Sequence, residues 1–390
     1  MISRRTVICL GTAQLIAWGT SYYLIGVFGE HIAATSGWSR GFTYGGFSVG
    51  LLVMGFASAW AGRAVDRHGG LPVLASGSLL NAAGCLGLAY AHHPAVYCLA
   101  WIVLGLSMRL TLYDAAFAAL ARIGGAGARR AMAQITLLGG LASTTFWPLG
   151  NALIAWLGWR GALVAYAAIS LAVIPLYFTL VAPRRQGDEP AEATTMANVP
   201  AADNDRASWW LYAAMMALVA FLNSGMSAHM IGILAGLGLG ASTAVWLASL
   251  RGIGQTAARV CEVAFGMGLS PLTLNLVATL LLTAGFMVVP IAGTGITQVV
   301  LFALAFGAGN GLMSITRGTL PLVLIDPARY GSITGRLLIP SFILAAAAPL
   351  VLGYLIEAHG PHAAVILCLA LALVILALTV ALSQRFSLRR

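Results

Sequence analysis

The chain has 390 residues, of which 60% are hydrophobic and only 8% are charged, and its mean hydropathy is +0.90. Soluble globular domains carry about 25% charged residues, so this composition excludes an ordinary soluble protein and indicates a polytopic membrane protein. The formal net charge of +10 would suit a nucleic-acid partner if the basic residues formed one patch.

Twelve apolar stretches follow one another along the chain, each long enough to cross a bilayer. About 20 apolar residues span the hydrocarbon core as a helix, and these runs are continuous rather than alternating, which favours helices over a transmembrane barrel. The predicted spans cover residues 6–29, 41–63, 71–91, 95–121, 131–157, 160–182, 209–235, 241–265, 271–292, 296–325, 331–357 and 361–384. The sequence thus predicts an all-α membrane protein with twelve transmembrane helices.

The distribution of arginines among the loops indicates the orientation of these helices in the membrane. All 21 basic residues are arginines, and they gather in alternate loops, whereas the opposite loops offer chiefly Arg40 and Arg160. By the positive-inside rule both termini are cytoplasmic, and we expect a multi-pass protein of the bacterial inner membrane. Arg4 and Arg5 precede an apolar run that is too long for a cleaved signal peptide. The charge therefore reflects topology, and no nucleic-acid partner is expected.

One stretch has the composition of a linker. Residues 183–208 contain three prolines and five of the eleven acidic residues. This stretch divides the predicted spans six and six, into an N-terminal bundle of residues 1–182 and a C-terminal bundle of residues 209–390.

A sequence repeat supports the division. Pro148-Leu149 followed by Gly158 recurs about 200 residues later as Pro349-Leu350 followed by Gly360. Because an even number of spans separates the copies, the two bundles have the same orientation, as in duplicated transporters that bind substrate between their halves.

The loop after the second predicted span carries a motif, since residues 62–70 read GRAVDRHGG. At this position the motif resembles the signature loop of the major facilitator superfamily, whose helix pattern is similar to that of the whole chain. The resemblance implies two pseudo-symmetric six-helix bundles and a transporter rather than an enzyme. It also implies a cytoplasmic latch formed by Gly62, Asp66, Arg67 and Gly69. A second copy, expected near residues 259–271, lacks the Asp-Arg pair.

Two short motifs resemble one branch of that superfamily. Residues 37–40 read GWSR and residues 158–160 read GWR, which is similar to monocarboxylate and oxalate/formate transporters. This resemblance implies small organic anions as substrates.

Ionisable residues inside predicted spans are functional candidates, because charge in the bilayer core is costly. Arg109 lies near the middle of the fourth span, with Tyr113 at i+4 and Asp114 about 140° away on a helical wheel. Arg251 lies near the middle of the eighth span, and Arg317 lies in the tenth. A carboxylate substrate matches the guanidinium group well, so this excess of arginine predicts an anionic substrate.

Polar and aromatic residues also line the first helix of each predicted bundle. Trp18 and Tyr22 lie four residues apart at mid-depth in the first span, and Asn223 lies in the seventh. We expect these residues to shape the substrate pocket. Asp114 is the candidate for proton coupling, because burial favours the protonated form of a carboxyl group and a nearby arginine favours the ionised form.

Structural alternatives remain for several of these residues. Arg109 and Asp114 are also interpreted as a structural ion pair, Arg317 as a partner of Asp326, and the Trp18 and Tyr22 stripe as helix packing. The five cysteines are scattered singly, so neither a metal site nor a disulfide framework is predicted.

The sequence as a whole predicts a proton-coupled secondary transporter of a monocarboxylate or dicarboxylate. It would work as a monomer in the bilayer, without a cofactor, by alternating access. The alternative is a proton-driven efflux transporter of drugs, metabolites or organoarsenicals.

Overall fold

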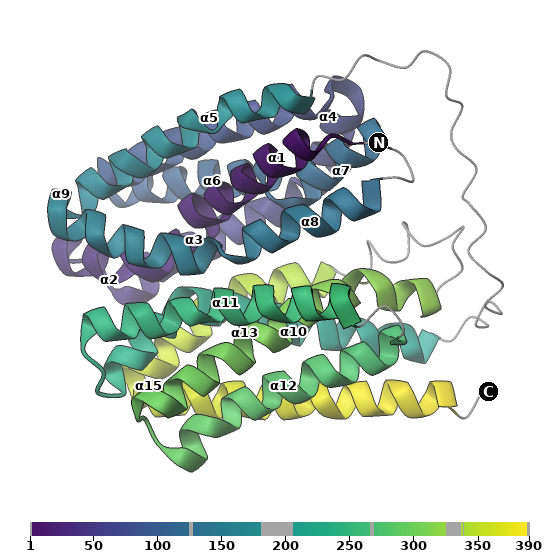
Figure 1. Ribbon diagram of the computed structural model, residues 1–390. Helices are drawn as coiled ribbons and strands as arrows, with labels where there is room; N and C mark the ends of the chain where they lie inside the picture. The colour runs from purple at the N-terminus through teal and green to yellow at the C-terminus, as the bar shows by residue number, and fades with distance from the viewer. Residues whose placement is uncertain are drawn as a thin grey trace, which may run out of the picture. The chain divides into compact units, whose positions relative to one another are not determined.

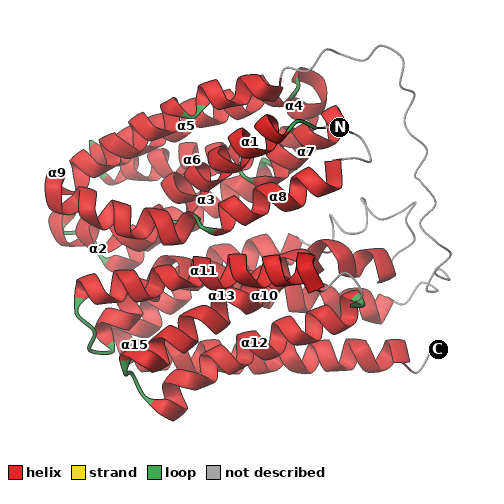
Figure 2. Cartoon of the chain, in the orientation of Figure 1, coloured by secondary structure: helices red, strands yellow, loops and turns green. Residues whose placement is uncertain are grey.

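The computed structural model describes residues 2–124, 128–180, 206–265, 269–324, 337 and 339–387. The chain divides into two compact units, Met1–Asn198 and Val199–Arg390. Every regular element in the described residues is a helix (Figure 2), which confirms the all-α prediction. Of the predicted linker only residues 206–208 are described, so the proposed bundle boundaries stay a prediction.

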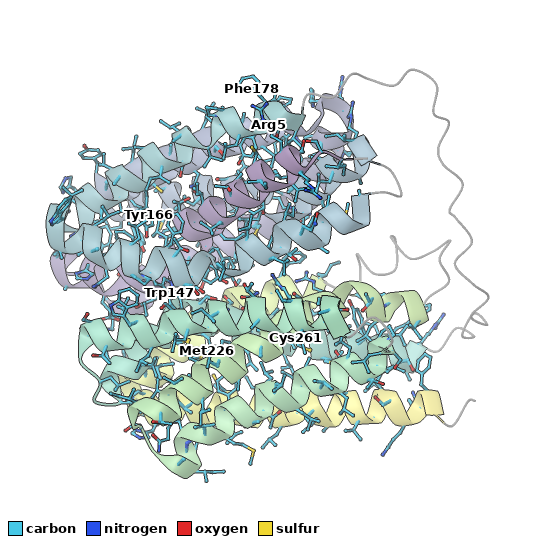
Figure 3. The ribbon with its side chains drawn as sticks, in the orientation of Figure 1. Arg5, Trp147, Tyr166, Phe178, Met226 and Cys261 are labelled. Atoms are coloured by element: carbon cyan, nitrogen blue, oxygen red, sulfur yellow. The ribbon has the colours of Figure 1, made fainter. Side chains whose placement is uncertain are left out.

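The N-terminal unit is a bundle in which α5 packs against both α6 and α9 (Figure 1). Large aromatic side chains fill its interior: Figure 3 shows Tyr166 inside the unit and Phe178 at its outer surface. Its elements are α1 Arg4–Ala17, a π-helical turn Trp18–Tyr22, α2 Leu24–Ser36, α3 Arg40–Phe56, α4 Ser58–His68, α5 Gly70–Ala89, α6 Pro94–Thr111, α7 Tyr113–Gly124, α8 Ala128–Gly140, α9 Ala142–Ala172 and a 3₁₀ segment Ile174–Leu180.

The C-terminal unit is built from longer helices. In it α10 packs along α15, and α13 packs against both α11 and α12. The elements are α10 Arg206–Gly236, α11 Ala241–Phe265, α12 Pro271–Ala292, α13 Ile296–Leu324 and α15 Ile339–Ser387.

Seven helical stretches in the described residues are long and apolar enough to cross a membrane. Two of them, Ala131–Leu180 and Ile339–Phe386, each cover described residues of two predicted spans. The predicted first, second, fourth and fifth spans are each interrupted between helices, although Pro94–Gly124 still forms one of the seven stretches. The count of twelve spans therefore stays a prediction.

The sequence repeat is also a repeat of backbone conformation. Gly158 in α9 has φ 67° and ψ 166°, and Gly360 in α15 has φ 79° and ψ 173°. Residues with a side chain rarely adopt a positive φ, so each position requires glycine. Each long helix thus consists of two segments that meet at a glycine, and each has a proline, Pro148 or Pro349, before the junction.

Glycines also allow two equivalent pairs of helices to pack closely. A Cβ atom on Gly50 of α3 would meet the carbonyl oxygen of Trp101 on α6, and one on Gly254 of α11 would meet the carbonyl oxygen of Leu304 on α13. Small residues are what allow membrane helices to approach this closely. These contacts recur at an offset of about 203 residues. The pair α3 and α6 therefore corresponds to the pair α11 and α13, although the sequence comparison found no repeat in these helices.

Hydroxyl groups of α10 satisfy the carbonyl groups that two prolines leave free. A proline has no N–H to donate to the carbonyl four residues earlier. Pro321 of α13 thus frees the Arg317 oxygen, which accepts a hydrogen bond from Tyr212 Oη at 2.7 Å. Pro349 of α15 frees the Ala345 oxygen, which accepts one from Ser224 Oγ at 2.7 Å. These two bonds attach α10 to both helices.

The Ser224 bond predicts a specific coupling with Pro349. Ser224→Ala should destabilise the protein by roughly 0.6 to 1.7 kcal/mol, the range for hydrogen bonds between membrane helices. In a Pro349→Ala background the same change should lower the free energy of unfolding far less, because the alanine supplies the missing N–H to the Ala345 carbonyl. A double-mutant cycle of unfolding measurements checks this; equal costs in both backgrounds would contradict it.

Candidate functional site

The first helix of the N-terminal unit widens into a π-helical turn at Trp18–Tyr22. Such turns often occur at functional sites, because they rotate the side chains that follow them. Polar contacts with α5 and α9 hold the turn: Asn81 Nδ2 donates to Thr20 Oγ1 and to Ser170 Oγ, each at 2.7 Å. The turn is therefore a fixed part of the bundle core.

The π-helical turn brings Trp18 and Tyr22 into one aromatic cluster with Tyr113 of α7. The ring of Trp18 lies 5.0 Å from that of Tyr22 and 5.0 Å from that of Tyr113. Tyr113 in turn stacks on Phe117 at 5.5 Å. Three residues predicted for the pocket are thus together in the structure.

The predicted fourth span breaks beside its charged residues. Helix α6 ends at Thr111, Leu112 is extended with ψ −177°, and α7 begins at Tyr113. The prediction of one continuous helix here is wrong. Because of the break the helical-wheel angle between Arg109 and Asp114 does not apply, and Arg109 Nη1 donates to Asp114 Oδ2 in an ion pair.

The two members of this ion pair differ in exposure. The side chain of Arg109 is 14% exposed, whereas that of Asp114 is 64% exposed. The sequence led us to expect a buried acid, but Asp114 lies in the first turn of a new helix and its side chain is largely exposed. Within the described residues, the buried N–H groups of Arg109 Nε and Trp18 Nε1 have no hydrogen-bond acceptor. Such groups suit a ligand that brings acceptor oxygens.

A second polar cluster surrounds Arg251 in the C-terminal unit. The side chain of Arg251 is completely buried at 0% exposure. Its Nη1 donates to Ser227 Oγ at 3.0 Å, and its Nη2 donates to Asn223 Oδ1. Asn310 Nδ2 also donates to Asn223 Oδ1, at 3.0 Å, and the guanidinium lies 5.0 Å from the ring of Phe306. Neutral oxygens and an aromatic face thus contact the guanidinium group.

Arg251 begins a polar stripe on α11. Gln255 and Arg259 follow at intervals of four residues and are also buried. Arg259 Nη2 donates to Ser314 Oγ of α13 at 2.8 Å. The stripe therefore faces the neighbouring helices of its own unit.

Sequence reasoning missed Asn310 and Phe306. Asn310 lies between Gly309 and Gly311 of α13, and a lone amide in an apolar, glycine-rich segment is a signal that could have found it. Phe306 carried no such signal, because its contact with Arg251 depends on how closely α11 packs against α13.

Arg317, which is predicted for the same site as Arg109, differs from it in exposure. Its side chain is exposed on α13, outside the Arg251 cluster. The offset of about 203 residues given by the glycine contacts aligns Arg317 with Asp114 rather than with Arg109. The structure therefore does not make Arg109 and Arg317 equivalent residues.

The predicted latch lies at the junction of α4 and α5. Gly62 is part of α4, Arg67 is exposed near its end, and Gly69 has φ 87° where the chain turns into α5. Arg122 Nη1 of α7 donates to the Val65 carbonyl at 2.9 Å, which fixes the end of α4. The side chain of Asp66 lies outside the described residues.

Comparisons with known proteins identify the class of protein to which this chain belongs. The model of the Major Facilitator Superfamily matches residues 10–339, and the chain belongs to that family. It is accordingly a multi-pass membrane transporter and not an enzyme. No curated protein sequence matches the chain.

Solved structures share the fold at low sequence identity. A point mutant of the nucleoside transporter NupG matches with a TM-score of 0.74, 15% identity and coverage of 97% of this chain and 98% of that chain. Another NupG structure matches with a TM-score of 0.69, 16% identity and coverage of 98% of both chains. A bacterial homolog of the human lysosomal transporter Spinster matches with a TM-score of 0.67, 15% identity and coverage of 97% of this chain and 96% of that chain.

Proposed function

We propose that the protein is a secondary active transporter of a small organic anion, a monocarboxylate or dicarboxylate, coupled to protons. It would work by alternating access in the bacterial inner membrane, with both termini in the cytoplasm. The short motifs similar to monocarboxylate and oxalate/formate transporters support the same class of substrate.

The observation that carries this proposal is the complete burial of the Arg251 guanidinium. Asn223 and Ser227 accept hydrogen bonds from it and hold it in one orientation. A guanidinium group binds a carboxylate through opposite charge and bidentate geometry. A positively charged, preorganised group of this kind favours an anion over a lipophilic cation.

The N-terminal unit contains a further candidate for anion binding, formed by a guanidinium group and aromatic rings. Arg109 would bind the anion through the N–H that has no acceptor among the described residues. Trp18, Tyr22 and Tyr113 would pack against the carbon skeleton of the substrate. Arg317 would assist from the exposed face of α13.

Proton coupling would depend on the pair of Arg109 and Asp114. When Arg109 turns to a substrate carboxylate, Asp114 loses its positive partner, which would link the state of this carboxylate to substrate binding. Binding of the anion and of a proton would then occur together.

The coupling hypothesis predicts that Asp114→Asn separates transport from accumulation. The variant should still exchange substrate across the membrane but should no longer concentrate it when a pH gradient is imposed. Glu30→Gln is a matched control, because Glu30 forms the Arg40 ion pair elsewhere in the same unit. Accumulation by Asp114→Asn equal to that of the wild type would rule out the coupling role.

The substrate class is tested by uptake into proteoliposomes. Labelled monocarboxylates, dicarboxylates, nucleosides and lipophilic cations are compared, with and without a pH gradient. We expect uptake of at least one carboxylate and stimulation by an inward proton gradient. Transport of nucleosides or cations without any carboxylate would overturn the proposal.

Proton-driven efflux of drugs, metabolites or organoarsenicals is the alternative. The aromatic cluster of Trp18, Tyr22 and Tyr113 suits a larger apolar substrate, and the same assay distinguishes the two functions. An exporter would load vesicles of inverted orientation when the pH inside is low, whereas a symporter would load them when the pH outside is low.

A further inference from the structure

A groove of about 600 Å³ lies between the beginning of α10 and the end of α15. Its walls are Ala207, Trp210, Leu211 and Ala214 on α10, with Ala381, Gln384 and Arg385 on α15. All of these residues belong to the C-terminal unit. The groove is separate from the Arg251 cluster and takes no part in the proposed transport site.

Polarity changes along the groove in one direction. Arg385 lines the groove near the end of α15, and Arg206 begins α10, one residue before the lining residue Ala207. Further into the helices the lining becomes Leu211, Ala214 and Ala381, which carry no polar side-chain atoms. This order, a cationic end followed by an apolar channel, is the order that fits a phospholipid headgroup and its acyl chain.

Trp210 marks the level of the membrane interface. Its side chain is 66% exposed beside the groove, although a large aromatic ring is seldom left in water. Tryptophan is enriched at the level of lipid headgroups, where its ring is partly apolar and its N–H is polar. Arginines next to that level attract anionic lipids of the cytoplasmic leaflet.

We propose that this groove binds an anionic phospholipid, with Arg385 and Arg206 at the phosphate and an acyl chain along Leu211, Ala214 and Ala381. The guanidinium group can donate two parallel hydrogen bonds to a phosphate. A zwitterionic lipid carries a compensating positive charge, so it would bind more weakly. The bound lipid would tie the first helix of the C-terminal unit to the last one.

Native mass spectrometry of the full-length protein, released from nanodiscs with equal phosphatidylglycerol and phosphatidylcholine, tests the proposal. We expect the wild type to retain phosphatidylglycerol at least several-fold over phosphatidylcholine. Arg385→Gln should abolish most of that preference. Ala381→Phe should reduce retention of both lipids, because the ring fills the apolar part of the groove.

Arg5→Gln is the matched control, since Arg5 is an exposed arginine on the N-terminal unit (Figure 3) and is not one of the residues that line the groove. It should leave the preference unchanged. Loss of preference in Arg5→Gln equal to that in Arg385→Gln would show only a general charge effect and would overturn the proposal. Equal retention of the two lipids by the wild type would also overturn it.

Two further measurements distinguish a bound lipid from other occupants of the groove. Inorganic phosphate at millimolar concentration should not displace the retained lipid; displacement would indicate a site for free phosphate. Neutralising the five acidic residues of 183–208 should not raise lipid retention. A several-fold rise would show that this acidic segment occupies the groove, which would contradict the proposal.

Discussion

Replacing Arg251 by glutamine is expected to weaken binding of the transported anion by about 10- to 100-fold. The substitution removes the buried positive charge, whose guanidinium group donates to Asn223 and Ser227, while keeping a side chain that can donate hydrogen bonds. Hydrogen bonds to charged groups contribute about 1.5 to 3 kcal/mol, and about 1.4 kcal/mol corresponds to a factor of ten. Binding of a carboxylate identified by the uptake panel, measured by calorimetry on purified protein, checks the result.

Two matched variants separate binding from folding. Ser227→Ala removes one hydrogen-bond partner but keeps the charge, so it should weaken binding by less than tenfold. Arg251→Lys keeps the charge without the planar donor pair and should give an intermediate affinity. If Arg251→Gln binds the anion as the wild type does, while its melting temperature falls, Arg251 is a structural residue and the proposed site is wrong.

Replacing Gly307 by valine should cost more stability than any other single change considered. A Cβ atom on Gly307 of α13 would meet the carbonyl oxygen of Arg251 on α11, and backbone atoms cannot move aside as a flexible side chain can. Overpacking typically costs about 1 to 3 kcal/mol. The helices must separate, and Arg251 would move with α11. We therefore expect a lower melting temperature and loss of transport together.

Gly318→Val is the control for that prediction. Gly318 lies on the same helix, and among the described residues no atom outside the neighbouring backbone of α13 lies within 4 Å of the position that its Cβ would take. The intrinsic helix preference changes by the same amount in both variants, so only the contact with α11 differs. Equal melting temperatures for Gly307→Val and Gly318→Val would refute the close-packing explanation.

The helical architecture could be predicted because apolar length alone determines it. Where the structure describes them, the predicted spans coincide largely with helical residues, and the repeat around Gly158 and Gly360 appears as the same backbone conformation twice. The π-helical turn at Trp18–Tyr22 could not be predicted, because it depends on tertiary contacts such as those of Asn81 with Thr20 and Ser170.

The candidate site was only partly accessible from the sequence. Arg251 stood out because a charge within an apolar run is expensive, and Asn223 was identified by its depth in α10. The ion pair of Arg109 and Asp114 was one of two interpretations of these residues, but the angle between them was derived for an uninterrupted helix, whereas Leu112 is extended. The approach of Asn310 and Phe306 to Arg251 depends on the packing of α13 against α11, which no local pattern encodes.

The glycine junctions at Gly158 and Gly360 also bear on how the protein can be labelled. A single non-helical glycine joins two helices at each junction, so the residues on both sides of it are helical. An epitope tag or protease site inserted there would have to disrupt helical residues. The turn at Gly293, which ends α12 with φ 86° before α13 begins at Ile296, offers a short stretch of non-helical chain. Topology reporters should therefore be tolerated after Gly293 and rejected at both junctions.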